Sequence, residues 1–145
     1  MQIRVFQPAD ETAVIGLWND CGLIRPTNDP KKDIFRKSSV NPELFLVGEV
    51  KGKIVASVMA GYEGHRGWVN YVSVSPECRR QGYGRKILAE VERLLRLRGC
   101  PKINLQVRAT NHEAVKFYES LGFKVDEVIS MGKRLEKDSV QPSNR

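Results

Sequence analysis

The chain has 145 residues and a formal net charge of +7 at pH 7. Its length predicts one domain with a substantial core, and its shares of hydrophobic (41%) and charged (28%) residues exclude disorder throughout. No apolar run approaches the ~18–20 residues of a membrane-spanning helix. The N-terminus also lacks a signal-peptide pattern, so we expect a cytoplasmic protein without membrane contact. The positive charge calls for an anionic partner.

The cysteines and histidines are few and scattered. Cys21, Cys78 and Cys100 form no CxxC pair, and only two histidines are present, so the sequence indicates neither a disulfide framework nor a metal site. We therefore expect no metal.

The first 40 residues predict a strand and two helices. Gln2–Gln7 alternates between apolar and polar residues, which is typical of a strand. Asp10 is suited to cap a helix that extends to about residue 21 and is stopped by Gly22. A shorter helix is expected around Lys31–Ser38.

Three strand patterns separated by turns follow in the middle of the chain. They are expected at Leu44–Val50, Lys53–Gly61 and Trp68–Val74. Their short connections predict antiparallel neighbours.

The strongest helix pattern precedes another strand. An apolar stripe with helical spacing ends before Gly99, and Lys102–Arg108 then alternates like a strand. The stripe consists of Ile87, Leu88, Val91, Leu94 and Leu95. Because the intervening helix is long enough for a parallel crossover, Trp68–Val74 and Lys102–Arg108 are expected to run parallel.

The remaining residues complete a single domain over residues 1–135. Asn111 is suited to cap a helix over His112–Leu121, and Phe123–Leu135 is expected to be a last strand region. Glu136–Arg145 is polar and predicts a frayed tail. The order of elements predicts an α/β (α+β) fold with one mixed sheet and helices on both faces.

The segment between the third central strand and the strongest helix carries the clearest chemical signal. After Val74 the chain forms a basic loop containing Gly82 and Gly84, and the helix begins there. Free N–H groups at a helix N-terminus attract anions, and glycine lets a phosphate approach the backbone. The sequence predicts a phosphate-binding loop, although an ordinary turn remains the alternative.

These residues resemble a known family. Arg79-Arg80-Gln81-Gly82-Tyr83-Gly84 matches the (Gln/Arg)-x-x-Gly-x-(Gly/Ala) signature of the GNAT acetyltransferases. The segment from Asn111 to Phe123 continues the likeness with Asn-x-x-Ala-x-x-Phe-Tyr-Glu-Ser-Leu-Gly-Phe. Three further stretches resemble small bacterial members of the YpeA type, namely 25–30, 64–67 and 98–103.

The resemblance implies a mostly antiparallel sheet with a splayed parallel pair in its centre and acetyl-CoA bound between those two strands. Backbone groups of Val72 and Val74 would contact the pantetheine arm, and Asn111 would lie near it. Asn111 as a plain helix cap is an equal and compatible alternative. The phosphates would be held by Arg79, Arg80, Gln81, Gly82, Tyr83, Gly84 and Arg85.

Tyr118 matches the tyrosine that many family members place near the sulfur of acetyl-CoA. A phenol can donate a proton to a leaving thiolate. A core aromatic role is the alternative. The resemblance therefore predicts Tyr118 as the general acid.

The sequence offers no clear general base. Gln106 stands where alanine-acetylating relatives have a glutamate, and glutamine cannot take up a proton. Glu63 falls at a predicted turn. The proton must leave through a water chain, or the amine must arrive neutral.

Three functions remain open at this stage. The first is transfer of an acetyl group to a small-molecule or peptide amine by a monomer or homodimer. The second is a catalytically silent CoA-binding module. The third is a basic nucleic-acid-binding domain, which we disfavour because residues 79–98 hold a net charge of +5 beside the phosphate loop. Asp29 and Asp33 could attract an ammonium group, and His65 and Arg66 a carboxylate, but solvated loops are the better explanation of all four residues.

Overall fold

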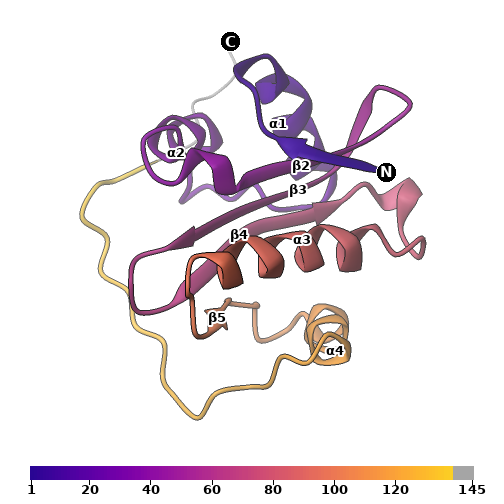
Figure 1. The fold of residues 1–145 in the computed structure, drawn as a ribbon. Coiled ribbons are helices and arrows are strands. Elements are labelled where there is room, and N and C mark those ends of the chain that lie inside the picture. The colour runs from indigo at the N-terminus through magenta and orange to yellow at the C-terminus, as the bar shows by residue number, and fades with distance from the viewer. Residues whose placement is uncertain (139–145) are drawn as a thin grey trace.

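A single sheet with the strand order β1-β2-β3-β4-β5 organises the computed structural model, which describes residues 1–138 (Figure 1). Its strands are β1 (Gln2–Val5), β2 (Phe45–Val50), β3 (Lys53–Tyr62), β4 (Gly67–Val74) and β5 (Ile103–Asn104). Its α-helices are α1 (Glu11–Asp20), α2 (Pro30–Lys37), α3 (Tyr83–Leu97) and α4 (His112–Ser120). Short 3-10 helices occupy Pro8–Asp10 (η1), Pro42–Leu44 (η2) and Pro76–Cys78 (η3).

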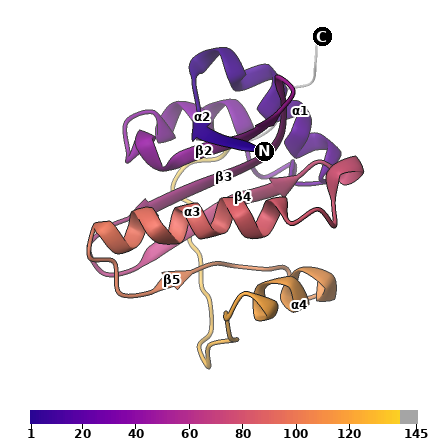
Figure 2. The same ribbon diagram turned by 45° about the vertical axis from the view of Figure 1, so that its right-hand side comes forward.

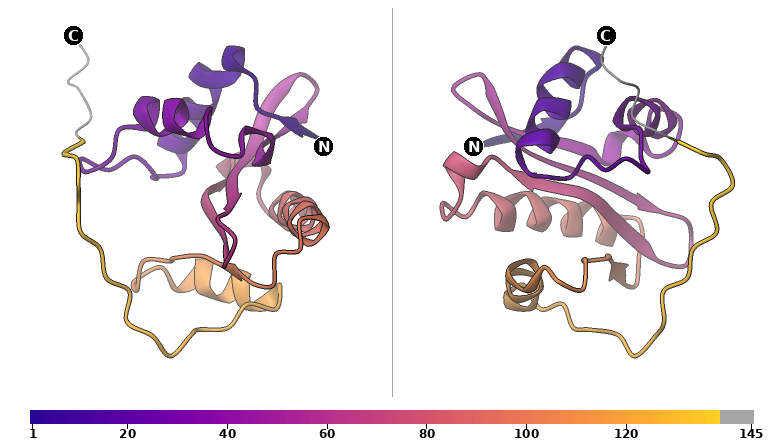
Figure 3. Two further views of the ribbon diagram at one scale, coloured as in Figure 1. Left: turned by 60° about the vertical axis from the view of Figure 1, so that its left-hand side comes forward. Right: turned by 180° about the vertical axis from the view of Figure 1, so that it is seen from behind.

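Helices cover both faces of this sheet, as expected. Figure 3 (left) shows the sheet edge-on, with α3 on one side and α1 and α2 on the other. The apolar stripe of α3 is buried against one face through Ile87, Leu88, Val91 and Leu95. Val14 and Trp18 of α1 are fully buried on the opposite face. Burial of each large apolar side chain contributes about 1.5–3 kcal/mol, so packing rather than helix propensity holds these helices.

The sheet is mixed, as predicted. Strands β1 to β4 are antiparallel neighbours, whereas β4 and β5 run parallel. The parallel ladder is short, because only Gly67 and Trp68 pair with Ile103 and Asn104. Beyond these residues, no strand of the described chain pairs with the edge of β4 that faces β5.

A β-bulge interrupts β4 just beyond this short ladder. Ser57 pairs with Ser73 and Met59 pairs with Asn70, so Val58 alone faces two residues of β4. The extra residue is Tyr71, whose φ of +51° lies in the left-handed region. This conformation costs a side-chain-bearing residue about 1–3 kcal/mol, and such strain persists only where the surroundings enforce it.

The two last strands predicted from the sequence are shorter in the structure or absent from it. The strand expected over Lys102–Arg108 is reduced to two residues, and Phe123–Leu135 forms no strand. The parallel pair therefore lies at the edge of the described sheet rather than in its centre. A strand needs a neighbour to accept its backbone hydrogen bonds, and β5 offers an edge of only two residues.

The chain after α4 instead runs as an extended segment around the sheet edge to α2 (Figure 1). It is attached by a few polar contacts, including an ion pair of 2.8 Å between Lys102 and Asp126. At its far end, Arg36 of α2 donates hydrogen bonds of 2.7 and 3.0 Å to Asp138. The frayed tail expected from residue 136 thus has its first three residues beside α2, and residues 139–145 lie outside the described chain. Within residues 1–138, no helix has the length and apolarity needed to cross a bilayer.

An ionic cluster fixes the start of the chain to the sheet. Arg4 donates two hydrogen bonds, of 2.8 and 2.9 Å, to the buried carboxylate of Asp10 and a third of 2.8 Å to Glu49. Asp10 also accepts from the backbone N–H of Gln7 at 2.7 Å. Arg4 holds the pKa of Asp10 below its ordinary value, although burial alone would raise it.

We expect Asp10→Ala to lower the free energy of unfolding by about 2 kcal/mol, because it leaves Arg4 and the Gln7 N–H without their shared partner. As the pKa of Asp10 is depressed in the folded state, its contribution is present above the ordinary aspartate pKa. It is lost as the pH falls through the folded value. Urea unfolding between pH 3 and 7 measures both effects. Arg93→Ala breaks the exposed pair with Glu90 and should leave the free energy of unfolding nearly unchanged at any pH, because solvent screens this pair. An Asp10→Ala variant as stable as wild type would contradict the assignment.

Candidate functional site

The loop between β4 and α3 has the geometry of an anion site. Arg80 (φ +66°) and Gly82 (φ +81°) both have left-handed backbone conformations, which curl the loop. The first helical hydrogen bond of α3 runs from the N–H of Lys86 to the carbonyl of Gly82 at 3.0 Å. No side chain caps this helix. The N–H groups of the first turn therefore remain available to an anion, and the helix dipole adds positive potential there.

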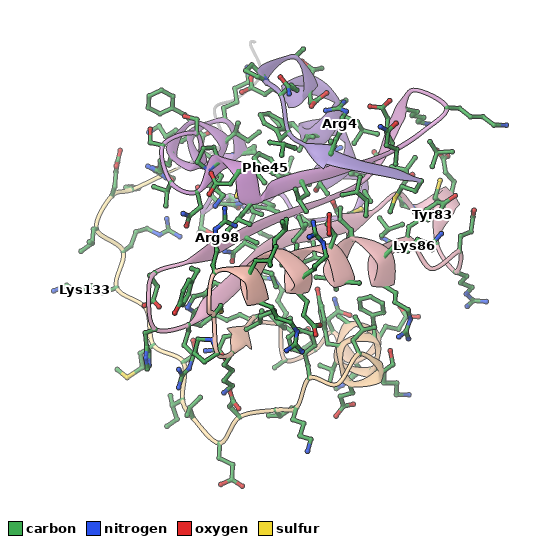
Figure 4. All side chains as sticks on the ribbon, in the orientation of Figure 1. Arg4, Phe45, Tyr83, Lys86, Arg98 and Lys133 are labelled. Carbon is green, nitrogen blue, oxygen red and sulfur yellow. The ribbon has the colours of Figure 1, made fainter. Side chains whose placement is uncertain are left out.

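The unpaired positive charge is concentrated at the same place. Of the seven basic residues between positions 79 and 98, Arg93, Arg96 and Arg98 form ion pairs with glutamates. The other four form no ion pair with any residue that the structure describes; they are Arg79, Arg80, Arg85 and Lys86. Figure 4 shows Lys86 and Tyr83 at the N-terminal end of α3, far from Arg98 at its other end.

The two glycines of the motif have different surroundings. A side chain at Gly82 would meet no atom within 4 Å, so steric space does not restrict this position, whereas its positive φ does. A Cβ at Gly84 would lie 3.0 Å from the Phe117 ring of α4 and 3.6 Å from Val74. Gly84 thus permits the close approach of α3, α4 and the end of β4.

The expected donor-binding edge of β4 is partly occupied. The carbonyl of Val74 accepts a hydrogen bond of 3.3 Å from the Cys21 thiol and another of 3.3 Å from Nε of Arg79. Burial raises the pKa of Cys21, so its thiol keeps the proton that it donates. Val72 packs toward the α3 core and has no neighbouring strand on the β5 side of the described chain.

A cleft of about 1620 Å³ opens between the first half of β4, the C-terminal half of α3, β5, α4 and the extended segment that follows α4. Tyr118 and Gln106 both line it, together with Trp68 and Asn70 of β4. A smaller cavity of about 190 Å³, which Arg85 lines, shares Ile103 and other wall residues with the cleft. Arg85 and Tyr118 therefore line adjoining cavities rather than one, and residues 79–84 line neither of the two.

Tyr118 is held by aromatic packing. Its ring makes edge contacts with Phe117 and Phe123, with ring centroids 5.2 and 5.7 Å away. Burial raises the pKa of Tyr118 to about 12. Its hydroxyl hydrogen-bonds to nothing in residues 1–138. The phenol is therefore protonated at neutral pH and free to donate toward the cleft.

Other residues singled out in the sequence have structural partners. Asn111 caps α4 by accepting from the N–H of Ala114 at 3.1 Å, and Gln106 donates to Ser130 of the extended segment. Glu63 accepts from the backbone N–H groups of Arg66 and His65, which lower its pKa and close the β3–β4 turn.

The two aspartates expected near an acceptor are similarly engaged. Asp29 caps α2, and Asp33 accepts from Tyr71 at 2.6 Å and from Arg36 at 3.4 Å. Neither is a free counter-ion for an ammonium group. His65 and Arg66 lie in the β3–β4 turn, at the opposite end of β4 from the anion loop.

Glu119 is a cleft residue that the sequence analysis missed. It lines the cleft beside Tyr118 and forms no ion pair with a described residue, whereas Glu92 and Asp126 in the same walls are paired. Its place directly after Tyr118 in the motif was the available signal. It is a candidate to receive a proton or attract a cation.

Comparisons with known proteins identify the family of this chain. The acetyltransferase (GNAT) family model matches residues 11–123. An acetyltransferase of Yersinia enterocolitica is 49% identical over 135 residues, covering 93% of this chain and 96% of that protein. The chain belongs to the GNAT family and is an N-acetyltransferase.

Solved structures of acetyltransferases share the fold. Ard1 from Thermoplasma volcanium superimposes with a TM-score of 0.76 at 26% identity, over 86% of this chain and 83% of that one. The ribosomal-protein-S18-alanine N-acetyltransferase from Escherichia coli has a TM-score of 0.71 at 26% identity, over 85% and 77%.

Gly84→Ala should destabilise the protein by about 1 kcal/mol, because the added methyl group forces the Phe117 ring away and overpacks the α3–α4 contact. Phe117→Leu in the same chain should recover part of this loss, since the shorter side chain vacates the space. Urea unfolding of the two single variants and the double variant gives the coupling. Additive effects in the double variant would show that Gly84 and Phe117 do not limit each other.

Proposed function

We propose that this N-acetyltransferase uses acetyl-CoA as its acetyl donor and acts on a primary amine by direct attack. The observation that carries the proposal is the curled loop, where the uncapped N–H groups at the start of α3 coincide with four cations that have no carboxylate partner within residues 1–138. This arrangement suits the pyrophosphate and the remaining phosphate of CoA. In the proposal, the pantetheine arm extends along the free edge of β4 beside Val72 toward the cleft.

The reaction would proceed at the thioester carbon. The neutral amine nitrogen attacks this carbon, the C–N bond forms, and the C–S bond of the tetrahedral intermediate then breaks. Tyr118 donates its proton to the departing sulfur, and the proton that the nitrogen loses on forming the amide passes to water, from which the Tyr118 phenolate regains one. The raised pKa supports an acid and argues against a basic role, since the phenolate is scarce below pH 12.

Alanine-acetylating relatives have a glutamate at the position of Gln106, so in this chain the proton of the amine nitrogen must leave by another route. Gln106 binds Ser130, and Glu63 closes a turn, so neither serves as a base. We infer that the amine arrives neutral or loses its proton to water, with Glu119 as the carboxylate best placed to be tested. Gln106 also makes an alanine N-terminus a doubtful acceptor, despite the structural likeness to an S18-alanine N-acetyltransferase.

The two other functions that the sequence left open predict different outcomes in a binding experiment. A CoA-binding module without catalysis would keep the loop and bind acetyl-CoA, but it would release no CoA when amines are added. A nucleic-acid-binding domain would use the same basic loop in a sequence-specific DNA complex that survives moderate salt, whereas a loop that serves CoA would hold duplex DNA only weakly and moderate salt would displace it. The proposed cytoplasmic location fits an acetyl-CoA-dependent reaction.

A binding and turnover experiment separates these possibilities. We expect acetyl-CoA to raise Tm, since the folded state alone binds it, and a panel of small amines, amino acids and peptides to identify an acceptor by CoA release. Acetyl-CoA binding without amine-dependent release would support the silent module. Salt-resistant DNA binding without an acetyl-CoA effect would support the nucleic-acid domain.

Gly82→Asp should fold but lose measurable acetyl-CoA binding, because it places a negative charge and a side chain where the phosphates are proposed to lie. Gly82→Asn is the matched control, with similar size and tolerance of positive φ but no charge. Its affinity should fall less. Calorimetric titration checks both variants. An unchanged affinity of folded Gly82→Asp would remove the loop from the donor site.

Tyr118→Phe should lower kcat by roughly 10²-fold, because it removes the acid and keeps most of the packing. Gln106→Ala should lower kcat by about tenfold, because it removes the contact with Ser130 in the wall of the cleft. With wild type, the rate should rise with pH until the acceptor amine is neutral, and the limiting pKa should follow the amine used.

Acceptors of different basicity provide the measurement. A limiting pKa that stays fixed across amines, and that disappears in Glu119→Gln, would identify Glu119 as an enzymic base and contradict the neutral-amine route. Equal kcat for Tyr118→Phe and wild type would return Tyr118 to a packing role.

A further inference from the structure

Side chains hold the bulge at Tyr71 by contacts to its backbone carbonyl and to its side chain, and none of these side chains has a role in the proposed reaction. Beneath the bulge, the hydroxyl of Ser57 donates to the carbonyl of Tyr71 at 3.3 Å. Ser57 also accepts from Nε1 of Trp18 at 2.8 Å and lies 2.7 Å from the hydroxyl of Ser73. Ser57 is fully buried, so its hydroxyl provides a hydrogen-bond donor for the Tyr71 carbonyl, which the bulge displaces from the regular ladder.

The side chain of Tyr71 is clamped as firmly. Its ring stacks on Trp18 with centroids 3.8 Å apart and an interplanar angle of 11°. Its hydroxyl donates to Asp33 at 2.6 Å and accepts from Asn28 at 2.5 Å. Burial, aided by the Asp33 carboxylate, raises the pKa of Tyr71, so the hydroxyl remains a donor at all working pH values.

The clamp lies next to the proposed donor edge. Tyr71 directly precedes Val72, and the ladder between β4 and β5 stops three residues earlier, at Trp68. Asn70, on the other side of Tyr71, lines the cleft that also contains Tyr118. A change in the conformation of Tyr71 therefore changes where the backbone groups of residues 70–72 point.

We propose that Tyr71, clamped by Asp33 and Asn28, is a positioning residue that holds the β4 edge in the conformation that binds the acyl donor. This inference rests on the proposed function. The clamp acts through the backbone of Val72 and touches no reacting atom. The two partners of its hydroxyl, Asp33 of α2 and Asn28 of the loop before α2, lie about 40 residues before Tyr71 in the sequence.

A clamp of this kind affects binding more than chemistry. If the clamp is loosened, the competent conformation of β4 becomes a minor population, and the apparent Kd for donor rises by the inverse of that fraction. The bound state is unchanged, so kcat at saturating donor is unchanged. A side chain with only a stabilising role would instead lower Tm and leave the Kd and KM for acetyl-CoA as they are.

The experiment measures calorimetric Kd for acetyl-CoA, together with KM and kcat for a working acceptor, in matched variants. Tyr71→Phe removes the hydroxyl and keeps the stacking on Trp18, and it should weaken acetyl-CoA binding about tenfold. Tyr62→Phe is the control, because its hydroxyl contacts the carbonyl of Gly64 at 3.2 Å at the far end of the β3–β4 hairpin. The control should bind as wild type.

Asp33 variants test the clamp without altering Tyr71. Asp33→Asn keeps an acceptor for the hydroxyl and should stay within about twofold of wild type, whereas Asp33→Ala should match the loss in Tyr71→Phe. The double variant should lose no more than either single one, because both remove the same contact. Should Tyr71→Phe fail to fold, the contrast between the two Asp33 variants decides.

The outcomes separate the two proposals. If wild-type protein binds no acetyl-CoA, the proposed function is wrong. If wild type binds and the Tyr71 and Asp33 variants bind equally well, the donor site stands and the clamp is wrong. A fall in kcat with an unchanged KM for acetyl-CoA would also overturn the positioning role.

Discussion

The separation of β4 from β5 shapes most of what this acetyltransferase presents to a ligand. The two strands pair over only two residues each, and a bulge then diverts β4. In an ordinary ladder, the backbone groups beyond Trp68 would bond to the next strand. Here they border an open edge that leads from the cleft at Tyr118 to the loop before α3. Figure 2 shows β5 and the chain after it running below β4 and α3 toward α4.

This opening requires support, because strained and unpaired backbone costs free energy. Tyr71 shows how the fold provides it. Its left-handed backbone is balanced by a stack on a fully buried tryptophan, by a buried serine on its carbonyl and by two side chains on its hydroxyl. Gly84 plays a complementary part by letting α4 approach α3 and β4 closely. The packing that stabilises the domain and the geometry of the proposed donor site thus depend on the same residues.

Electrostatics adds direction to this geometry. The chain is basic overall, but Glu90, Glu92 and Glu43 pair with the cations at the C-terminal end of α3, whereas those of its first turn have no carboxylate partner within residues 1–138. The helix dipole points its positive end to the same place. The cations and the helix dipole would therefore attract a phosphate to the same place. Their coincidence indicates an anion site more strongly than the net charge of +7 alone.

Local patterns in the sequence determined the elements whose partners are close in the chain. The apolar stripe of α3, the turns between β2, β3 and β4, and the cap of α4 were all predictable, because spacing and capping chemistry act over a few residues. The Arg79–Gly84 motif identified the family for the same reason.

Only the tertiary structure decided the rest. Whether 123–135 forms a strand depends on an edge far away in sequence, and its alternating apolar residues do not reveal that β5 is too short to pair with it. The roles of Asp33 and Gln106 were likewise hidden, since Tyr71 and Ser130 reach them only when the chain is folded. The bulge itself carries no sequence signal, because tyrosine adopts a positive φ only where neighbouring layers enforce it.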